Sequence, residues 1–361
     1  MRILHTSDLH LRKKGDQRWK AFKEIIELAK RMEVDVLVIA GDMFDKGVDG
    51  ESLRSDVREL FKNIRFKTLI LPGNHDSSVF DSGRFWGNNV EVIDNYLKPY
   101  SIGDVDFWGL PFEDIKEDEV LSKIFEMNER MRNDRTNILI YHGELGDYSW
   151  MKGFGDEDDE NKRYMPVKKE FFKDTKIDYV LAGHFHTKFD SIKLPNGGWF
   201  IYPGTPVSIT KKEVGIRSVN ILDVGNSPQQ VSLPTFHYKR IVITLDPFKH
   251  QNPIQIIDGE VKKYTSLDSP NFQLILCVGG YIDSRKGVSE LDIMNYLTQI
   301  YREHRELFLE PPINDVRDIS VIINHPLYQD FNSKLQKRVS DEEQRQRILE
   351  YVIKAMMEVF Y

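Results

Sequence analysis

The sequence has a single cysteine, Cys277, and no apolar run of the roughly 18 residues that a membrane span requires. One cysteine cannot form an internal disulfide, which excludes a secreted disulfide scaffold and favours a reducing compartment. The first residues, MRILHTSD, lack the apolar region of a signal peptide. We therefore expect a soluble protein of the cytoplasm with no membrane contact.

The chain also has fewer basic than acidic residues. The chain of 361 residues has 50 Lys and Arg against 57 Asp and Glu, a formal net charge of −7. Proteins that bind nucleic acid on their own are more often basic, so the bulk charge counts mildly against DNA as a ligand. It does not exclude DNA, because local charge decides contact and acids at a metal site lower the total.

Short apolar runs alternate with segments of helical period up to about residue 225. This alternation predicts an α/β domain with a sheet-centred core. Buried strands are expected over residues 34–42, 67–76, 136–144 and 178–186, and helices over 18–32 and 52–64.

The turn-forming segment 226–240 predicts a domain boundary. A smaller α+β unit follows, with strands expected at 272–282 and 319–324 and a helix opening at Ser289. A terminal helix is expected to be capped by Ser340 and Glu343, and the acidic segment 155–163 is interpreted as a solvated loop. The predicted domains are residues 1–230, 231–328 and 329–361.

The four strands expected before residue 225, and the apolar run at the start of the chain, end in side chains of the types that bind metal ions. Because ligands of open α/β sheets lie beyond the carboxyl ends of the strands, these side chains are predicted to share one rim. Five of the ten histidines fall in these short motifs. The residues concerned are Asp8, His10, Asp42, Asn74, His75, Asp76, His142, His184 and His186.

Taken singly, each motif has a plainer interpretation: a turn for D-x-H, a hairpin for GNHD, and exposed imidazoles for GHFH. Together and in this order they predict a two-metal site, in which two divalent ions about 3.5–4 Å apart share a carboxylate. Asp42, on a central strand, is the natural bridge. Mixed Asp, Asn and His ligands without cysteine suit Mn²⁺, Fe²⁺ or Zn²⁺.

The series D-x-H, G-D-x-x-D, G-N-H-D, H and G-H-x-H resembles the calcineurin-like metallophosphoesterase superfamily over roughly residues 1–225. The resemblance implies a β-sandwich flanked by helices and two divalent ions at the site. It also implies a non-ligand, catalytic imidazole, His75, and supporting carboxylates at Asp45 and Asp76. The implied ligands are Asp8, His10, Asp42 and His186 for one ion, and Asp42, Asn74, His142 and His184 for the other.

Within that superfamily, the segment YPGTPVSI (202–209) and the layout of the C-terminal part resemble the SbcD-type nucleases. This resemblance implies a Mn²⁺-dependent 3′–5′ exonuclease and endonuclease acting on DNA in repair, recombination or replication. It implies a homodimer, a capping domain, and a C-terminal helical segment that binds an SbcC-like coiled-coil ATPase. Asp45 stands where archaeal and eukaryotic members often carry histidine, which favours a bacterial or phage origin.

Two surfaces each have two possible roles. Arg12, Lys13 and Lys14 follow the predicted ligands Asp8 and His10 in the sequence. They are expected to hold DNA phosphates, or else to form a solvated loop. The terminal apolar stripe is expected to bind the ATPase, or else to pack on the protein's own core. Its residues are Ile348, Leu349, Val352, Ile353, Met356 and Phe360.

Two other functions compete with a DNA nuclease. A phosphatase or phosphodiesterase acting on a small molecule or a phosphoprotein would use the same metals, because fold and metals do not choose the substrate. A metal-free scaffold that only holds the ATPase is the third possibility, and the complete set of predicted ligands argues against it.

Overall fold

The structure is a computed structural model that describes residues 1–360 except 81–83, 147–163, 250 and 268–269, and except the side chain of Phe360. The chain divides into two compact units, Met1–His237 and Tyr238–Tyr361. The expected acidic loop, 155–163, lies outside the described residues, and the boundary proposed at 328 stays a prediction. None of the helices in the described part is long and apolar enough to cross a membrane.

The first unit contains two six-stranded sheets, ordered β12-β11-β1-β2-β3-β4 and β5-β6-β7-β8-β10-β9. The strands of the first sheet are β1 (Arg2–Thr6), β2 (Val36–Ala40), β3 (Lys67–Leu71), β4 (Val90–Val92), β11 (Ser218–Asp223) and β12 (Gln229–Ser232). Those of the second are β5 (Tyr100–Ile102), β6 (Val105–Leu110), β7 (Thr136–His142), β8 (Tyr179–Gly183), β9 (Asp190–Lys193) and β10 (Trp199–Tyr202).

The central strands of both sheets run parallel. In the first sheet β1 pairs with β2 and β2 with β3, for example Leu4 with Leu37 and Val38 with Leu69. In the second, β6, β7, β8 and β10 are likewise parallel to their neighbours. Parallel strands end on the same side of a sheet, so the loops that follow them lie along one edge.

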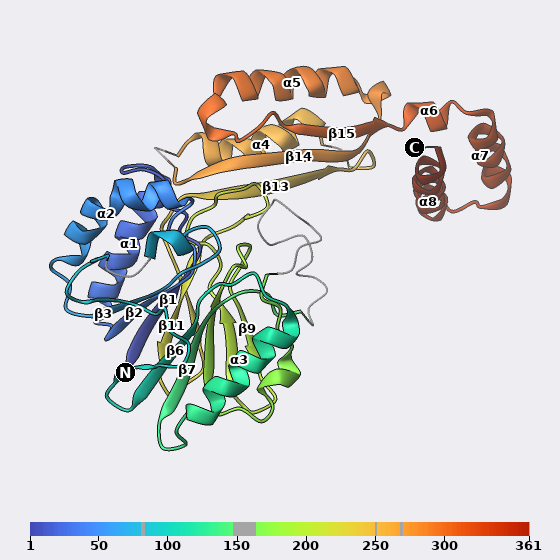
Figure 1. The fold of residues 1–361 in the computed structure, drawn as a ribbon. Helices are drawn as coiled ribbons and strands as arrows, with labels where there is room; N and C mark the ends of the chain where they lie inside the picture. Colours follow the sequence, from blue (N-terminus) through green and yellow to red (C-terminus); the bar gives the residue numbers. More distant parts are fainter. Residues whose placement is uncertain (81–83, 147–163, 250, 268–269, 361) are drawn as a thin grey trace. The chain divides into compact units, whose positions relative to one another are not determined.

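The two sheets face each other across an apolar layer that includes Val38 and Leu69 from one sheet and Ile140 and Leu181 from the other. Helices α1 (Gln17–Arg31) and α2 (Gly47–Phe61) pack on the outer face of the first sheet. Helix α3 (Glu117–Arg130) packs on the outer face of the second. The predicted α/β fold, a β-sandwich flanked by helices, is therefore confirmed (Figure 1).

The second unit is built on a three-stranded sheet of β13 (His237–Leu245), β14 (Phe272–Ile282) and β15 (Ile313–Asp318). Helices α4 (Pro253–Thr265) and α5 (Glu290–Glu303) contribute to its apolar core. Ser289 opens α5 as predicted: its hydroxyl accepts the backbone N–H of Asp292, whose carboxylate accepts the N–H of Ser289.

The strand expected at 319–324 is wrong. The strand of this region is β15, and residues 320–323 form the short helix α6 (Ser320–Ile323). The carboxylate of Asp318 accepts hydrogen bonds from Ser320 N and Oγ, at 2.9 and 2.6 Å, and so favours a helical turn. Ile319, Ile322 and Ile323 then lie at helical spacing and pack together in one cluster.

Two longer helices follow, α7 (Pro326–Arg338) and α8 (Glu342–Phe360). The predicted cap of α8 is one residue off, because Asp341 and not Ser340 accepts the N–H of the residue three positions on, Gln344, at 2.9 Å. Short 3₁₀ turns occur at Ser77–Phe80, Lys169–Phe172, Ser284–Lys286 and Arg305–Leu307.

Candidate metal centre

The predicted ligands lie where the parallel strands of the two sheets end. Backbone hydrogen bonds continue the β1–β2 pairing into the following loops, from Asp8 N to Gly41 O at 3.1 Å and from His10 N to Asp42 O at 3.0 Å. The second sheet joins the first at this rim, because His184 N donates to both oxygens of Asp8, at 3.0 and 3.1 Å. The site is thus shared by both halves of the sandwich.

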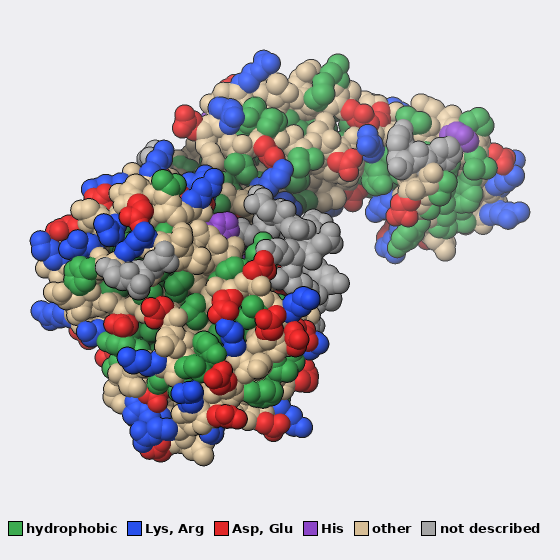
Figure 2. Space-filling view, viewed as in Figure 1, with side chains coloured by type: hydrophobic (Ala, Val, Ile, Leu, Met, Phe, Trp, Pro, Cys, Tyr) green, Lys and Arg blue, Asp and Glu red, His purple; other side chains and the backbone are tan. Residues whose placement is uncertain are grey.

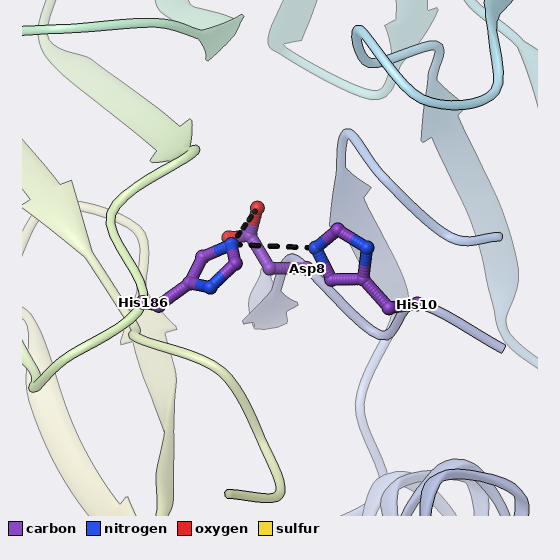
Figure 3. Close-up of side chains that lie close together, drawn as sticks. All are labelled: Asp8, His10 and His186. Carbon is purple, nitrogen blue, oxygen red and sulfur yellow. Dashed lines mark hydrogen bonds and ion pairs between the residues drawn. The ribbon is translucent and has the colours of Figure 1, made fainter. Parts of the chain in front are cut away.

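One group of converging side chains is Asp8, His10 and His186 (Figure 3). The Nε2 atoms of His10 and His186 are 3.3 Å apart, and His186 Nε2 is 3.6 Å from Asp8 Oδ1. All three residues are buried. Ligand atoms about 2.0–2.2 Å from one ion lie roughly 3.0–3.4 Å apart in octahedral or tetrahedral geometry, which these separations approach.

A second group is Asp8, Asp42 and His142. His142 Nε2 lies 3.1 Å from Asp42 Oδ2 and 3.0 Å from Asn74 Oδ1. Asp42 is also 4.0 Å from His10 Nε2, so its carboxylate lies between the two groups. From this position the carboxylate could bridge two ions, and bridging by Asp42 stays a prediction.

A third group contains His10, Asp42 and His75. The backbone N–H of His75 donates to Asp42 Oδ1 at 3.0 Å, and its Nδ1 lies 3.1 Å from the carbonyl oxygen of Asp45. The His75 ring meets the His10 ring edge to face, with centroids 5.0 Å apart. His75 therefore stands at the site, and its assignment as a non-ligand stays a prediction.

His184 is brought close to the second group. Its ring centroid is 5.4 Å from that of His142 and 4.7 Å from that of Tyr164. Both of its ring nitrogens are buried and have no hydrogen-bond partner among the described residues. Buried imidazole nitrogens are normally satisfied, so this pair indicates an absent partner such as a metal ion.

The hydrogen bonding of His142 tests whether a cation fits. Its Nδ1–H donates to the carbonyl of Ala40 at 2.9 Å. Nε2 then faces the oxygens of Asp42 and Asn74. These atoms need positive charge among them: without an ion a proton on Nε2 supplies it, and a divalent cation, which takes N and O ligands, would replace that proton.

The electrostatics of the site agree with that test. Burial by itself would lower the pKa of His142, but the carboxylates of Asp42 and Asp8 raise it to about 9. Burial by itself would raise the pKa of Asp42, but the imidazole of His142 and the more distant rings of His10 and His75 hold it well below its usual value. The protein thus concentrates negative potential at a buried point, which favours a bound cation.

Glycines in the motifs make room for these side chains. A Cβ on Gly41 would lie 1.9 Å from the His142 ring, and one on Gly73 would lie 2.1 Å from Asp42 Oδ1. A Cβ on Gly183 would meet the carbonyl of Ala40 at 1.9 Å. The glycines of G-D, G-N-H-D and G-H-x-H are therefore required by close approach, for a reason that the motifs alone do not show.

The backbone at the site is strained. Asp8, His10, Asp42 and His184 have φ angles of 54°, 45°, 49° and 86°. Residues other than glycine rarely adopt positive φ, and each costs about 1–3 kcal/mol. Such strain persists where the surrounding structure imposes it, which is common at functional sites.

The two predicted supporting carboxylates hold the loops. Asp76 accepts the N–H groups of Gly73 and Phe44, at 2.8 and 3.0 Å, and so joins the loops after β3 and β2. Burial and the nearby charge of Asp42 raise the pKa of Asp76 to about 7. Asp45 accepts from Arg18 at 2.7 Å and lies 3.7 Å from His10 Nδ1.

The three basic residues assigned to DNA lie on the surface. Arg12 donates to Asp45 at 2.8 Å, Lys14 pairs with Asp56 at 2.6 Å, and Lys13 is exposed. On the face shown in Figure 2, further Lys and Arg side chains lie over α2, mixed with acidic ones. DNA contact by Arg12, Lys13 and Lys14 stays a prediction.

The six residues assigned to the partner lie on α8. Leu349, Val352, Ile353 and Met356 belong to the apolar cluster of α6–α8, and Ile353 is only 3% exposed. Ile348 is half-buried, and the side chain of Phe360 lies outside the described residues. Intramolecular packing, the alternative left open, thus accounts for part of the stripe.

Three charged residues at the site were missed by the sequence interpretation. Glu213 contacts His186, Arg217 donates to the backbone of the same loop, and Arg18 donates to the carbonyl of His10 at 2.6 Å. The segment KKEVGIR around Glu213 looks like an ordinary surface loop. Only its nearness in sequence to YPGTPVSI could have indicated a role.

The chain is similar in sequence to proteins of known families. The profile of the family described as "Calcineurin-like phosphoesterase" matches residues 1–188. The chain is 24% identical over 320 residues to the DNA double-strand break repair protein Mre11 of Methanosarcina acetivorans, covering 81% of this chain and 48% of that protein. It is 26% identical over 219 residues to the SbcD subunit of the nuclease SbcCD of Staphylococcus saprophyticus, covering 52% of this chain and 57% of that protein.

The chain is also 23% identical over 234 residues to Mre11 of Saccharolobus solfataricus, covering 59% of this chain and 56% of that protein. It therefore spans about half the length of the curated relatives that it matches. Among solved structures, TT1561 of Thermus thermophilus has 16% identity and a TM-score of 0.40, covering 64% of this chain and 98% of that one, a likeness too slight to add to the family match.

The predicted resemblance to metallophosphoesterases is confirmed by the family match, which takes in just over half of the 361 residues. The matched part includes the parallel strands of both sheets except β10, and the converging carboxylates and imidazoles. The chain belongs to the calcineurin-like phosphoesterase family.

Proposed function

We propose that this protein is a two-metal DNA nuclease, with 3′–5′ exonuclease and endonuclease activity, that works with an SbcC-like ATPase. The observation that carries the proposal is the convergence of Asp8, Asp42 and the surrounding imidazoles at the shared rim of two sheets. The names of the relatives supply the substrate, since one is a nuclease subunit and two are DNA repair proteins. Mn²⁺ is the proposed metal because the resemblance to SbcD-type nucleases implies it, and the N and O donors are compatible with it.

In this proposal the carboxylates and imidazoles at the rim would hold two divalent ions, which would supply Lewis-acid chemistry: a more acidic water and neutralised charge on the phosphate. Asp42 lies between the two ligand groups and holds them at a fixed separation. His75 is kept in place by its backbone N–H bond to Asp42 and its ring contact with the Asp45 carbonyl. From there it donates a proton to the leaving oxygen of the scissile phosphodiester.

The choice of substrate is tested by comparing linear duplex DNA with a chromogenic phosphomonoester, each with and without Mn²⁺. We expect Mn²⁺-dependent cleavage of the DNA and little turnover of the monoester. A clear preference for the monoester would instead support the competing proposal of a phosphatase acting on a small molecule or a phosphoprotein. Removing Mn²⁺ with a chelator is expected to abolish cleavage in either case.

Association with an ATPase is proposed to use the outward face of α8. Tyr351 lies three residues after Ile348, and Val359 lies eight residues after Tyr351, so the three residues share a face of the helix. Tyr351 and Val359 are 74% and 83% exposed, while the opposite face packs within the second unit. Exposed aromatic and aliphatic side chains in a row are suited to pack against a coiled-coil partner.

We expect the double variant Tyr351→Asp, Val359→Asp to lose association with a co-expressed SbcC-like ATPase by at least about tenfold. Mn²⁺-dependent cleavage by the isolated chain should change little, because both residues belong to the second unit and every proposed metal ligand belongs to the first. Leu327→Asp is the matched control, since Leu327 is an exposed apolar residue of α7 outside this row. Undiminished binding by the double variant would assign the partner to another surface.

The proposed homodimer follows from the resemblance to SbcD-type nucleases, in which helices near the N-terminus form the contact. In this chain those helices are α1 and α2. Their inner faces pack on the first sheet, and Val48 of α2 is exposed.

A further inference from the structure

Glu213 is a buried carboxylate in the segment between β10 and β11, only 1% exposed. We propose that Glu213 is a positioning residue of the metal centre, which accepts the Nδ1–H of His186 and so turns its Nε2 toward the ion. This inference rests on the proposed metal centre and not on the choice of DNA as the substrate.

The two ring nitrogens of His186 face different partners. Nδ1 lies 3.3 Å from Glu213 Oε1, while Nε2 lies 3.3 Å from His10 Nε2 and 3.6 Å from Asp8 Oδ1. A carboxylate beside Nδ1 favours the proton at that nitrogen, which leaves the Nε2 lone pair for a metal. The Glu213 contact therefore selects both the tautomer and the orientation of the ligand.

Glu213 is itself firmly held. Its Oε2 accepts the N–H of Ile209 at 2.5 Å and the hydroxyl of Thr205 at 3.2 Å, and its Oε1 accepts the hydroxyl of Thr210 at 3.2 Å. Burying a carboxylate costs several kcal/mol unless its partners compensate. A buried carboxylate with this many donors is a rigid acceptor, able to fix the imidazole that it contacts.

Arg217 ties the backbone of the ligand to the same segment. Its guanidinium donates to the carbonyls of His186, Thr187 and Thr205, at 2.6, 2.9 and 2.9 Å. The side chain is buried, and its charge lies close to that of Glu213. One segment thus holds His186 twice, by its ring through Glu213 and by its main chain through Arg217.

This assignment goes beyond the family match, which ends at residue 188. Glu213 and Arg217 follow that point, in the part of the sandwich that leads into β11. They hold the ring and the backbone of His186, which is a proposed ligand of one of the two ions. Partners of this kind typically contribute 10–100-fold, roughly, to metal affinity.

The test is Mn²⁺ binding by the full chain carrying Glu213→Gln, measured by isothermal titration calorimetry. Glutamine keeps the shape but can present an N–H to Nδ1, which would favour the wrong tautomer. We expect one of the two Mn²⁺ sites to weaken by about 10–100-fold and the other to change little. With Co²⁺ in place of Mn²⁺, the visible absorption of the weakened site should shift, since its ligand field changes.

The matched control is Asp106→Asn. Asp106 is 4% exposed, accepts from Ser101 and pairs with Arg135 at 2.8 Å, and lies near the amino end of β6, away from the rim. It should lose similar stability but keep both Mn²⁺ affinities. Parental affinities in Glu213→Gln would overturn this assignment alone. A parent protein that binds no Mn²⁺ would overturn it together with the proposed metal centre.

Discussion

Asp42→Asn is expected to reduce Mn²⁺ binding from two ions per chain to one at most, and to abolish cleavage. The Asp42 carboxylate lies 3.1 Å from His142 Nε2 and 4.0 Å from His10 Nε2, so one substitution touches both proposed sites. The loss in affinity should exceed the roughly 10–100-fold that follows removal of a ligand's hydrogen-bond partner. Metal analysis after gel filtration, with calorimetric titration, measures the stoichiometry and both affinities.

Asparagine is the right replacement at this position. It keeps the size of the side chain and an oxygen for the His75 N–H, and it tolerates the positive φ of 49° better than most residues. Circular dichroism should therefore show an unchanged fold. If Asp42→Asn still bound two Mn²⁺ ions with parental affinity, Asp42 would not be the bridging ligand.

His75→Ala is expected to keep both metal ions and DNA binding while losing about 10²–10⁴-fold in the rate of DNA cleavage. The reason is the proposed role as proton donor to the leaving oxygen, which no metal ligand duplicates. Single-turnover cleavage at saturating Mn²⁺ measures the chemical step, and filter binding of DNA in Ca²⁺ measures affinity without reaction.

A substrate that needs no proton gives the sharpest control for His75. The p-nitrophenolate group of bis-p-nitrophenyl phosphate leaves without protonation, so the defect of His75→Ala should shrink strongly on that diester. An equal defect on both substrates would argue against acid catalysis. Loss of a Mn²⁺ ion would make His75 a ligand, which its nearness to His10 and Asp42 allows geometrically.

The sequence was most informative where a local pattern determines position. Asp8 and Asp42 lie just beyond parallel strands and His142 ends one, so the carboxyl-end rule predicted their convergence. The flanked sandwich followed from the family resemblance, because alternation of strands and helices alone does not distinguish one sheet from two. The fold brings these side chains close together, but the role of each as a metal ligand or a proton donor stays a prediction.

The sequence was least informative where contacts between distant segments determine the structure. Glu213 is 27 residues from the imidazole that it contacts and sits among lysines typical of a surface. The run at 319–323, rich in Ile and Val, has high strand propensity, but the Asp318 cap and packing against α8 made it a helix. On α8, helical period predicted one apolar face, and only the structure shows which residues the rest of the unit covers.

The left-handed backbone at Asp8, His10, Asp42 and His184 has a thermodynamic consequence. With about 1–3 kcal/mol of strain at each of these residues, the ion-free protein holds a backbone conformation that the chain disfavours. A ligand that binds only the folded state stabilises it by RT ln(1 + [L]/Kd), so the bound ions act on folding as well as on chemistry. The melting temperature should then rise with the logarithm of free Mn²⁺ concentration, and cellular metal supply would govern how long the protein survives.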